Sequence, residues 1–175
     1  MVDAWIIELS SFTYDSSNTY MIWYEDDHDH SRIYTINNKP ACFHNERSAR
    51  DMMINNGFCY KDTEKYDTEK LLNWCSASSG PQKDHGISEI GCGTLIDFWN
   101  LFDDIYYSLD PEYLPVMTRR SRRCYYKLFH GIDLPMIKLE GYRYDPVFTR
   151  KDIRFIRTFL KQGIDHLSDN IVYYD

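Results

Sequence analysis

The sequence predicts an α+β fold, in which an N-terminal antiparallel sheet of three to five strands carries about five packed helices. Before Asn45, short apolar and aromatic runs alternate with polar turns, which is typical of strands. After Asn45 the apolar residues recur with a period of about 3.6, which indicates amphipathic helices. With 175 residues and 43% hydrophobic content, the chain can build a core and is expected to form one domain, residues 1–175.

Four short segments are expected to form the first strands: Trp5–Leu9, Tyr20–Tyr24, Arg32–Ile36 and Ala41–Phe43. They are rich in aromatic and β-branched residues, which suit a pleated surface. The run between the second and third segments is polar throughout and is expected to be an exposed hairpin loop. The N-terminal sheet is therefore expected to be built from hairpins.

Five helices are expected after these strands: Asn45–Asn56, Tyr66–Ser76, Thr94–Leu109, Met117–His130 and one that opens at Thr149 and runs past Ile164. Residues that can cap a helix stand at three of the starts: Asn45, Thr94 with Asp97, and Thr149 with Asp152. The Ser- and Gly-rich stretch 76–93 is expected to be a flexible loop. Two later strands are expected at Met136–Leu139 and Ile171–Tyr174.

Acidic residues outnumber basic ones, 27 against 20, so the chain has a formal charge of −7 and a pI near 5.3. Proteins that bind nucleic acid through its phosphates need a basic surface. The charge balance therefore argues against general electrostatic binding to RNA or DNA. It favours a basic macromolecular partner, because opposite charges speed the encounter of two proteins.

The chain is expected to be cytoplasmic. Residues Met1–Glu8 lack the basic start and apolar core of a secretory signal peptide. No apolar run approaches the ~18 residues of a membrane span, so no membrane partner is expected. The five cysteines are scattered, odd in number and without a CxxC pair, which is typical of reduced thiols. They are Cys42, Cys59, Cys75, Cys92 and Cys124.

Two features resemble parts of reactive sites. His28 and His30 lie in an acidic run, but no third ligand stands at a characteristic spacing, so no metal and no cofactor is expected. Cys92 precedes the strongest predicted helix, where aligned peptide dipoles would stabilise a thiolate. A catalytic Cys92 would also need a histidine base brought close by the fold, and the candidates are His44, His85 and His130.

The segment Arg119–Arg123 is the one basic concentration in the chain. It is followed by Tyr125 and Tyr126, and basic residues interleaved with aromatic rings are typical of single-stranded nucleic-acid contacts. Acidic residues that stand nearby in the chain can neutralise it, which favours a salt-bridged helix face instead. These acidic residues are Asp103, Asp104, Asp110 and Glu112.

The 15 tyrosines are more than a core of this size needs. Tyrosine buries a large area at low entropic cost and keeps a polar tip, so it is enriched at binding surfaces. Tyrosines beside carboxylates therefore predict a surface that binds a protein. The candidate residues are Glu25, Asp26, Asp27, Asp29, Asp103, Asp104, Tyr106 and Tyr107. On a helix Asp103 and Tyr107 share a face, while Ile105 turns inward.

An acidic, aromatic-rich domain of this kind resembles the immunity proteins of bacterial contact-dependent growth inhibition systems. The resemblance lies in the pattern of Trp5–Leu9, Met21–Tyr24 and Ile33–Ile36 leading into Asn45–Gly57, and in the Phe98–Asp104 helix. In that family the immunity protein stays in the cytoplasm of the producing cell. There it binds the toxin domain of a sibling cell's effector, and many of these toxins are RNases or DNases.

The resemblance implies a protein without enzymatic activity that covers the active cleft of a basic nuclease toxin. Nucleic acid is not an expected partner in this interpretation. Two alternatives stay open. One is a cysteine-dependent enzyme centred on Cys92, and the other is a nucleic-acid-binding regulator that uses Arg119–Arg123.

Overall fold

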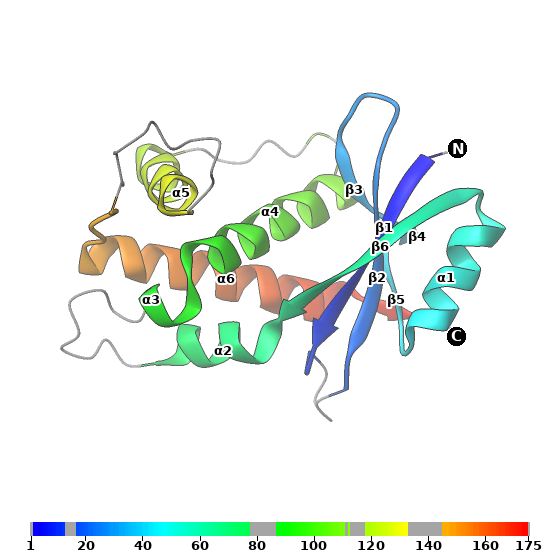
Figure 1. Cartoon of the computed structure of the whole chain (residues 1–175), viewed down its shortest axis with the longest axis horizontal. Coiled ribbons are helices and arrows are strands. Elements are labelled where there is room, and N and C mark those ends of the chain that lie inside the picture. The colour runs from blue at the N-terminus through cyan, green and yellow to red at the C-terminus, as the bar shows by residue number, and fades with distance from the viewer. Residues whose placement is uncertain are drawn as a thin grey trace.

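The computed structural model describes residues 2–12, 17–77, 87–110, 112, 118–132 and 145–174. Within these residues a sheet occupies one end of the molecule and a group of helices extends from it (Figure 1). Both chain termini lie at the sheet end. The predicted α+β class is confirmed.

The sheet is mixed. Its main strand order is β4-β5-β2-β1-β6, with β3 paired to β2 and β7 paired to β5. The pairs β1–β2, β2–β3, β2–β5 and β4–β5 are antiparallel, as predicted, but β1–β6 and β5–β7 are parallel. The strands are β1 (Val2–Ser10), β2 (Thr19–Glu25), β3 (Ser31–Ile33), β4 (Thr35–Ile36), β5 (Lys39–Phe43), β6 (Phe58–Asp67) and β7 (Val172–Tyr173).

Strand β6 is the element that the sequence pattern did not predict. Its second half is largely charged and shows no alternation of apolar residues, so it lacks the usual signal of a half-buried strand. Charges of this kind are typical of a strand at the edge of a sheet, which they protect from pairing with other chains. The preceding helix carries the chain across one sheet face, so β6 enters parallel to β1.

Six helices lie in the described residues: α1 (Glu46–Asn55), α2 (Thr68–Ser76), α3 (Ile87–Ile90), α4 (Cys92–Leu109), α5 (Arg119–Gly131) and α6 (Arg150–Asn170). Helix α1 covers one face of the sheet, and the other helices lie on the opposite side, where they pack largely on one another (Figure 1). The predicted strand Met136–Leu139 lies outside the described residues, and so do residues 78–86 of the predicted loop. The end of that predicted loop is helical, as α3 and the first turn of α4.

Two of the three predicted caps are confirmed. The side chain of Asn45 accepts a hydrogen bond from the Ser48 N–H, and Thr149 forms a capping box with Asp152. The predicted cap at Thr94 is wrong, because α4 already begins at Cys92. Its N-cap is Gly91, at a φ of 89°, and no side chain caps this end. Asp97 therefore stands inside the helix, where its side chain is free to face a neighbouring element.

Buried side chains lie on both faces of the sheet. On one face Ala4, Ile6 and Phe43 pack against Ala49 and Met53 of α1. On the other face Ile7, Leu9, Met21 and Ile33 join the larger core formed with α2 to α6. This double burial explains why β1 is a nearly continuous apolar run.

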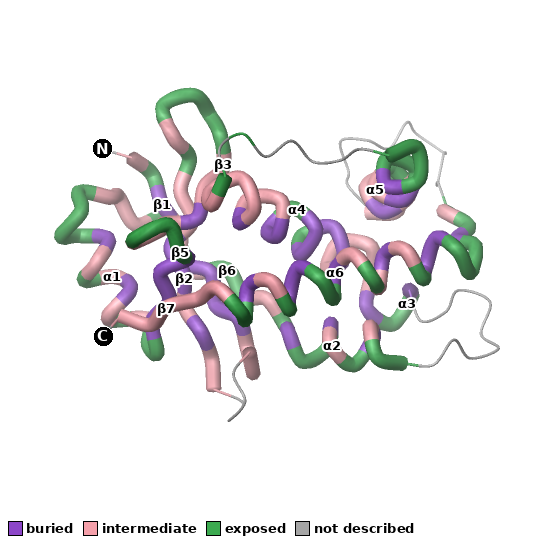
Figure 2. The backbone as a smooth tube through the Cα atoms, turned by 180° about the vertical axis from the view of Figure 1, so that it is seen from behind, coloured by how far each residue is buried: buried purple, intermediate pink, exposed green. Residues whose placement is uncertain are grey.

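A buried carboxylate ties α5 to α6. Asp152 is fully buried and accepts hydrogen bonds from Arg123 and from Lys127 Nζ, the latter at 2.9 Å. These two cations and the Thr149 N–H hold the pKa of Asp152 well below its ordinary value, against the effect of burial. Along α6, buried and exposed stretches alternate, as expected for an amphipathic helix (Figure 2). Among the described helices, none combines the length and the apolar character that crossing a membrane requires.

Trp99 should be one of the largest contributors to stability, because its side chain is only 2% exposed and stacks on Phe159 at 4.1 Å between centroids. We expect Trp99→Ala to lower the free energy of unfolding by about 3–5 kcal/mol. Urea unfolding of both proteins measures the change. The matched control is Tyr126→Ala, whose ring is 54% exposed and which should cost under about 1 kcal/mol. Equal effects of the two substitutions would contradict the packing described above.

Candidate functional site

The β2–β3 hairpin and the C-terminal end of α4 lie side by side. The guanidinium of Arg32 sits 3.9 Å from the centroid of the Tyr107 ring and donates to the Tyr107 carbonyl, 75 residues away in the chain. The Ile33 N–H donates to Ser108 Oγ at 2.7 Å, and the His30 ring meets the Tyr107 ring edge to face. The fold thus brings together the two acidic segments that the sequence singled out separately.

Asp26 does not offer its carboxylate to a partner. It accepts hydrogen bonds from the N–H groups of His28 and His30 and from Arg32 Nε, and so closes the hairpin loop. These bonds, the one from His30 above all, lower the pKa of Asp26 far below its ordinary value. The other predicted acidic residues of this loop, Glu25, Asp27 and Asp29, are exposed.

Asp103 and Asp104 are partly buried on α4. Asp104 accepts a hydrogen bond of 2.9 Å from the indole N–H of Trp23, and Trp23 packs edge to face on Trp5. Burial raises the pKa of each carboxyl to about 6. Within the described residues neither carboxylate forms an ion pair with a lysine or arginine. Both therefore carry charge at neutral pH without a compensating cation.

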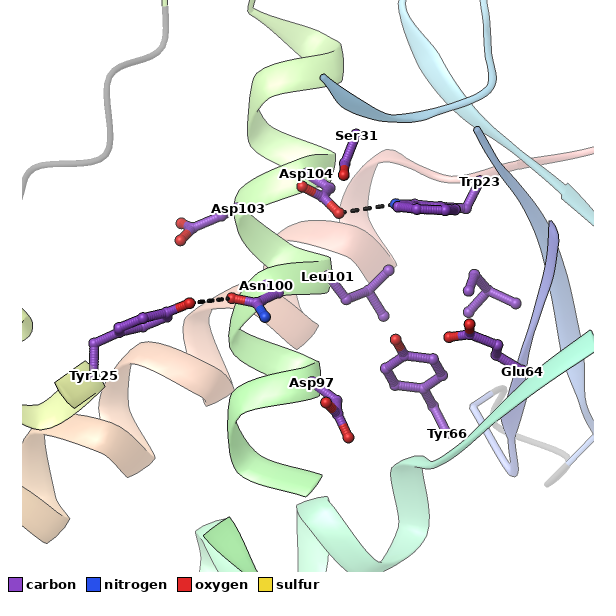
Figure 3. Close-up of a pocket in the computed structure, with 11 residues that line it drawn as sticks. Trp23, Ser31, Glu64, Tyr66, Asp97, Asn100, Leu101, Asp103, Asp104 and Tyr125 are labelled. Atoms are coloured by element: carbon purple, nitrogen blue, oxygen red, sulfur yellow. Dashed lines mark hydrogen bonds between the residues drawn. The ribbon is translucent and has the colours of Figure 1, made fainter. Parts of the chain in front are cut away.

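A groove of about 410 Å³ runs between α4 and the sheet (Figure 3). Asp97 and Glu64 line it together with Asp103 and Asp104. Burial, and then the charge of Glu64, raises the pKa of Asp97. A second hollow of about 300 Å³ shares Glu64, Tyr66 and Asp97 with the first and continues along β6. Besides the four carboxylates, the larger groove is lined by Ile7, Trp23, Ser31, Tyr66, Asn100, Leu101 and Tyr125.

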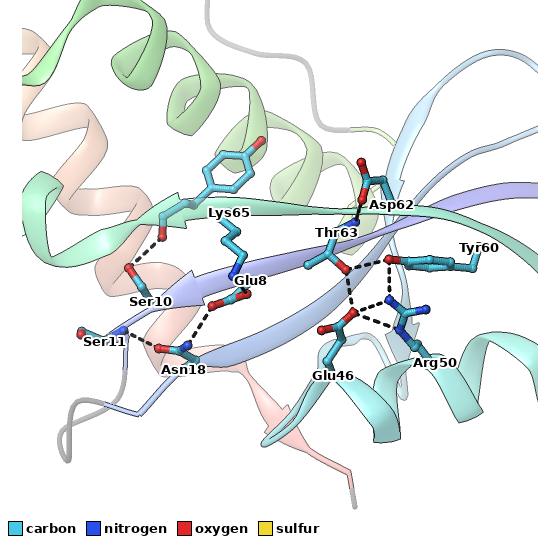
Figure 4. Close-up of polar contacts among 11 residues, drawn as sticks. Glu8, Ser10, Ser11, Asn18, Glu46, Arg50, Tyr60, Asp62, Thr63 and Lys65 are labelled. Carbon is cyan, nitrogen blue, oxygen red and sulfur yellow. Dashed lines mark hydrogen bonds and ion pairs between the residues drawn. The ribbon is translucent and has the colours of Figure 1, made fainter.

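Carboxylates on the opposite side of the sheet are treated differently by the fold (Figure 4). Glu46 accepts hydrogen bonds from Arg50 and from Thr63. Glu8 pairs with Lys65 at 3.1 Å and accepts from Asn18. These two carboxylates thus have a cation beside them, whereas the partly buried Asp103 and Asp104 have none among the described residues.

The groove adds residues that sequence reasoning missed. Asp97, Asn100 and Leu101 precede Asp104 at helical spacing, so a search along one face of α4 would have found them. Glu64 and Tyr66 had no such signal, because β6 was not recognised as a strand. Tyr106, which was predicted at the site, stacks instead on His166 of α6, with 4.6 Å between ring centroids. Tyr107 lies beneath Arg32.

Cys92 gains no support as a nucleophile. It does begin a helix, but burial raises the pKa of its thiol, with a smaller contribution from Asp145, so the thiolate is disfavoured. His85, one of the three candidate bases, lies outside the described residues. His44 stacks on Tyr173, and His130 stacks on Tyr126.

The basic segment lies on α5, but not in the way the sequence suggested. Asp103 and Asp104 do not neutralise it. Arg123 and Lys127 pair with buried Asp152, while Arg119, Arg120 and Arg122 are exposed and form no ion pair with the described residues. No group of three or more His, Cys, Asp or Glu side chains within the described part of the chain is placed to hold a metal ion.

Replacing one unpaired carboxylate should stabilise the protein in a pH-dependent way. The pKa of Asp103 in the folded protein is about 6, above the ordinary value of 3.8, so the folded state holds the proton more tightly than the unfolded chain. Stability from this group is present at low pH and is lost as pH rises through about 6. At pH 7.5 Asp103→Asn should therefore raise the free energy of unfolding by about 1 kcal/mol, a figure that allows for solvent screening.

Urea unfolding at pH 7.5 and at pH 4.5 tests this expectation, and most of the gain should vanish at the lower pH. The matched control is Asp51→Asn on α1, where the carboxylate is exposed and far from the groove. The same gain for Asp103→Asn at both pH values would mean that packing, and not the ionisation of Asp103, is responsible.

In comparisons with known proteins, no family model, no curated protein and no solved structure matches the chain. The resemblance to immunity proteins therefore stays a prediction. The observations that bear on function are the grouped acidic segments and the groove between α4 and the sheet.

Proposed function

We propose that the chain is the immunity protein of a contact-dependent growth inhibition pair, which acts in the cytoplasm by binding the cognate toxin domain. The observation that carries the proposal is a set of four groove carboxylates that form no ion pair with the described residues, next to an exposed acidic hairpin. Two of them, Asp103 and Asp104, are partly buried, and a partly buried carboxylate without a cation costs stability. A fold that keeps them in one place is therefore consistent with a binding role.

A basic nuclease is the toxin that best suits such a surface. Its active cleft is shaped and charged to hold phosphates, and carboxylates at similar spacing can occupy the same cleft. Long-range attraction speeds association and orients the two proteins. Aromatic rings beside the carboxylates, such as Trp23 and Tyr125, supply apolar contact that slows dissociation. The protein needs no catalytic residue, cofactor, nucleic acid or membrane for this function.

A second candidate function is binding of nucleic acid through α5. It is favoured by Arg119, Arg120 and Arg122, which are exposed and form no ion pair with the described residues. Such binding would weaken steeply with salt, because each phosphate contact releases counterions. A titration of RNA or DNA at two salt concentrations therefore separates this function from the proposed one. The chain's overall charge of −7 opposes it.

Reversing the groove charges should slow binding to the toxin. We expect Asp103→Lys with Asp104→Lys to lower the association rate by about tenfold or more at low ionic strength, because attraction becomes repulsion, and the defect should shrink as salt is added. The partner to use is the cognate toxin domain, which is to be sought in a large effector encoded next to this chain. Stopped-flow kinetics at two ionic strengths, with a growth-protection assay, measure both rate and function.

The control reverses two exposed acidic residues elsewhere, Asp51→Lys and Asp169→Lys, and so changes the net charge equally. Because Asp104→Lys also breaks the bond to Trp23, a loop variant that leaves the groove intact, Asp27→Lys, gives an independent reading. Unchanged association and protection in both the groove and the loop variants would refute the acidic-surface mechanism. No binding of the wild-type chain to the toxin would refute the function itself.

A further inference from the structure

We propose that the groove between α4 and β6 receives an arginine side chain of the toxin. This inference rests on the proposed function and names the group that would enter the groove. The groove offers negative charge, aromatic surface and room in one place, and arginine is the residue that uses all three.

The groove carries negative charge. Glu64 of β6 and Asp97 of α4 line opposite sides of the groove, and Asp104 lies about two helical turns further along α4 (Figure 3). None of these three carboxylates forms an ion pair with the described residues. Asp104 is partly buried, while Asp97 and Glu64 are exposed at the mouth of the groove. The groove therefore presents negative charge that a cation from a partner would complement.

The groove suits an organic cation better than a compact ion. Among the described side chains, no group of three or more His, Cys, Asp or Glu residues is placed to hold a metal ion. A groove of about 410 Å³ instead has room for an organic cation and the chain that bears it. The open end of a partner's side chain fits this description better than a compact ion does.

The lining of the groove suits arginine better than lysine. The rings of Trp23, Tyr66 and Tyr125 line the groove beside the carboxylates. A planar guanidinium can stack on an aromatic face while its edge donates to a carboxylate, whereas an ammonium is more strongly hydrated and less suited to stacking. This protein already uses the same combination elsewhere, since Arg32 stacks on Tyr107 and donates to Asp26.

The outer edge of β6 gives a polypeptide access to the groove. Glu64 and Tyr66 belong to β6, which is the last strand of the sheet on this side, and no strand from the described residues pairs with its outer edge. Backbone N–H and C=O groups at such an edge are available to a peptide. A toxin segment that passes along β6 would carry its side chain directly into the groove.

The test uses the whole chain and a small probe, N-acetyl-arginine N-methylamide. A single guanidinium contact should bind with a Kd on the order of 1–10 mM, which NMR can follow. The indole N–H of Trp23 is the reporter, because it lies in the groove and is held by Asp104. We expect a saturable shift of this signal, at least tenfold weaker affinity for the uncharged citrulline analogue, and weaker affinity for the lysine analogue.

Variants locate the binding. Asp97→Asn with Glu64→Gln removes two groove charges without touching the bond between Trp23 and Asp104, and should weaken the probe at least tenfold. The matched control, Asp51→Asn with Asp169→Asn, should leave its affinity unchanged. No saturable shift, equal affinity for the citrulline analogue, or equal affinity in the groove variant would each overturn the proposal.

The outcome is separable from that of the proposed function. A chain that protects cells from the toxin but does not bind the arginine probe refutes the arginine pocket and leaves the immunity function standing. A chain that binds the probe in the groove but neither binds the toxin nor protects cells refutes the immunity function, on which the toxin as the source of the arginine depends.

Discussion

The placement of α4 against the sheet depends on a small set of contacts at its C-terminal half. Trp23 donates to Asp104, Arg32 lies over Tyr107, and Ser108 accepts from the backbone of Ile33. All three join the helix to β2 and β3. Trp23 and Asp104 also line the groove, which continues from them toward β6. The same contacts that complete the fold thus create its most distinctive surface.

The groove has a thermodynamic cost that the rest of the molecule avoids. Asp152 is more deeply buried than any groove carboxylate, yet two cations and a helix cap stabilise its charge. Asp103 and Asp104 have no cationic partner among the described residues, and burial raises the pKa of both. Proteins commonly give up stability at binding surfaces, because groups that suit a partner do not suit the free chain. The contrast between these carboxylates is the physical basis of the proposed binding role.

Charge is separated across the helices. The groove side of α4 carries carboxylates, while α5 presents exposed arginines, and Asp152 compensates only the two basic residues that face it. Tyr125 of α5 also lines the groove, so the exposed arginines lie on the same helix as part of its wall. In the proposed complex a basic toxin would be attracted by the groove carboxylates and repelled by these arginines, and the two effects together would orient it.

The candidate site divides into what the sequence showed and what it hid. Acidic residues of the hairpin loop and of α4 were recognisable from composition and helical spacing. Glu64 and Tyr66 were not, because β6 lacks the alternation by which a strand is recognised and its position depends on the crossover through α1. Asp26 was recognised as acidic, but its bonds to two backbone N–H groups could not be read from the sequence, because they exist only in the folded loop.

The sequence by itself determined the α+β class, the apolar strands and the amphipathic helices, because these follow from the local period of apolar residues and from caps such as Asn45 and Thr149. Tertiary structure alone decided that β6 runs parallel to β1, and that Asp152, and not Asp103 or Asp104, neutralises part of α5. It also decided that Glu64 and Asp97 line opposite sides of one groove. These pairings join residues far apart in the chain, and no local pattern encodes which distant charges end up as neighbours.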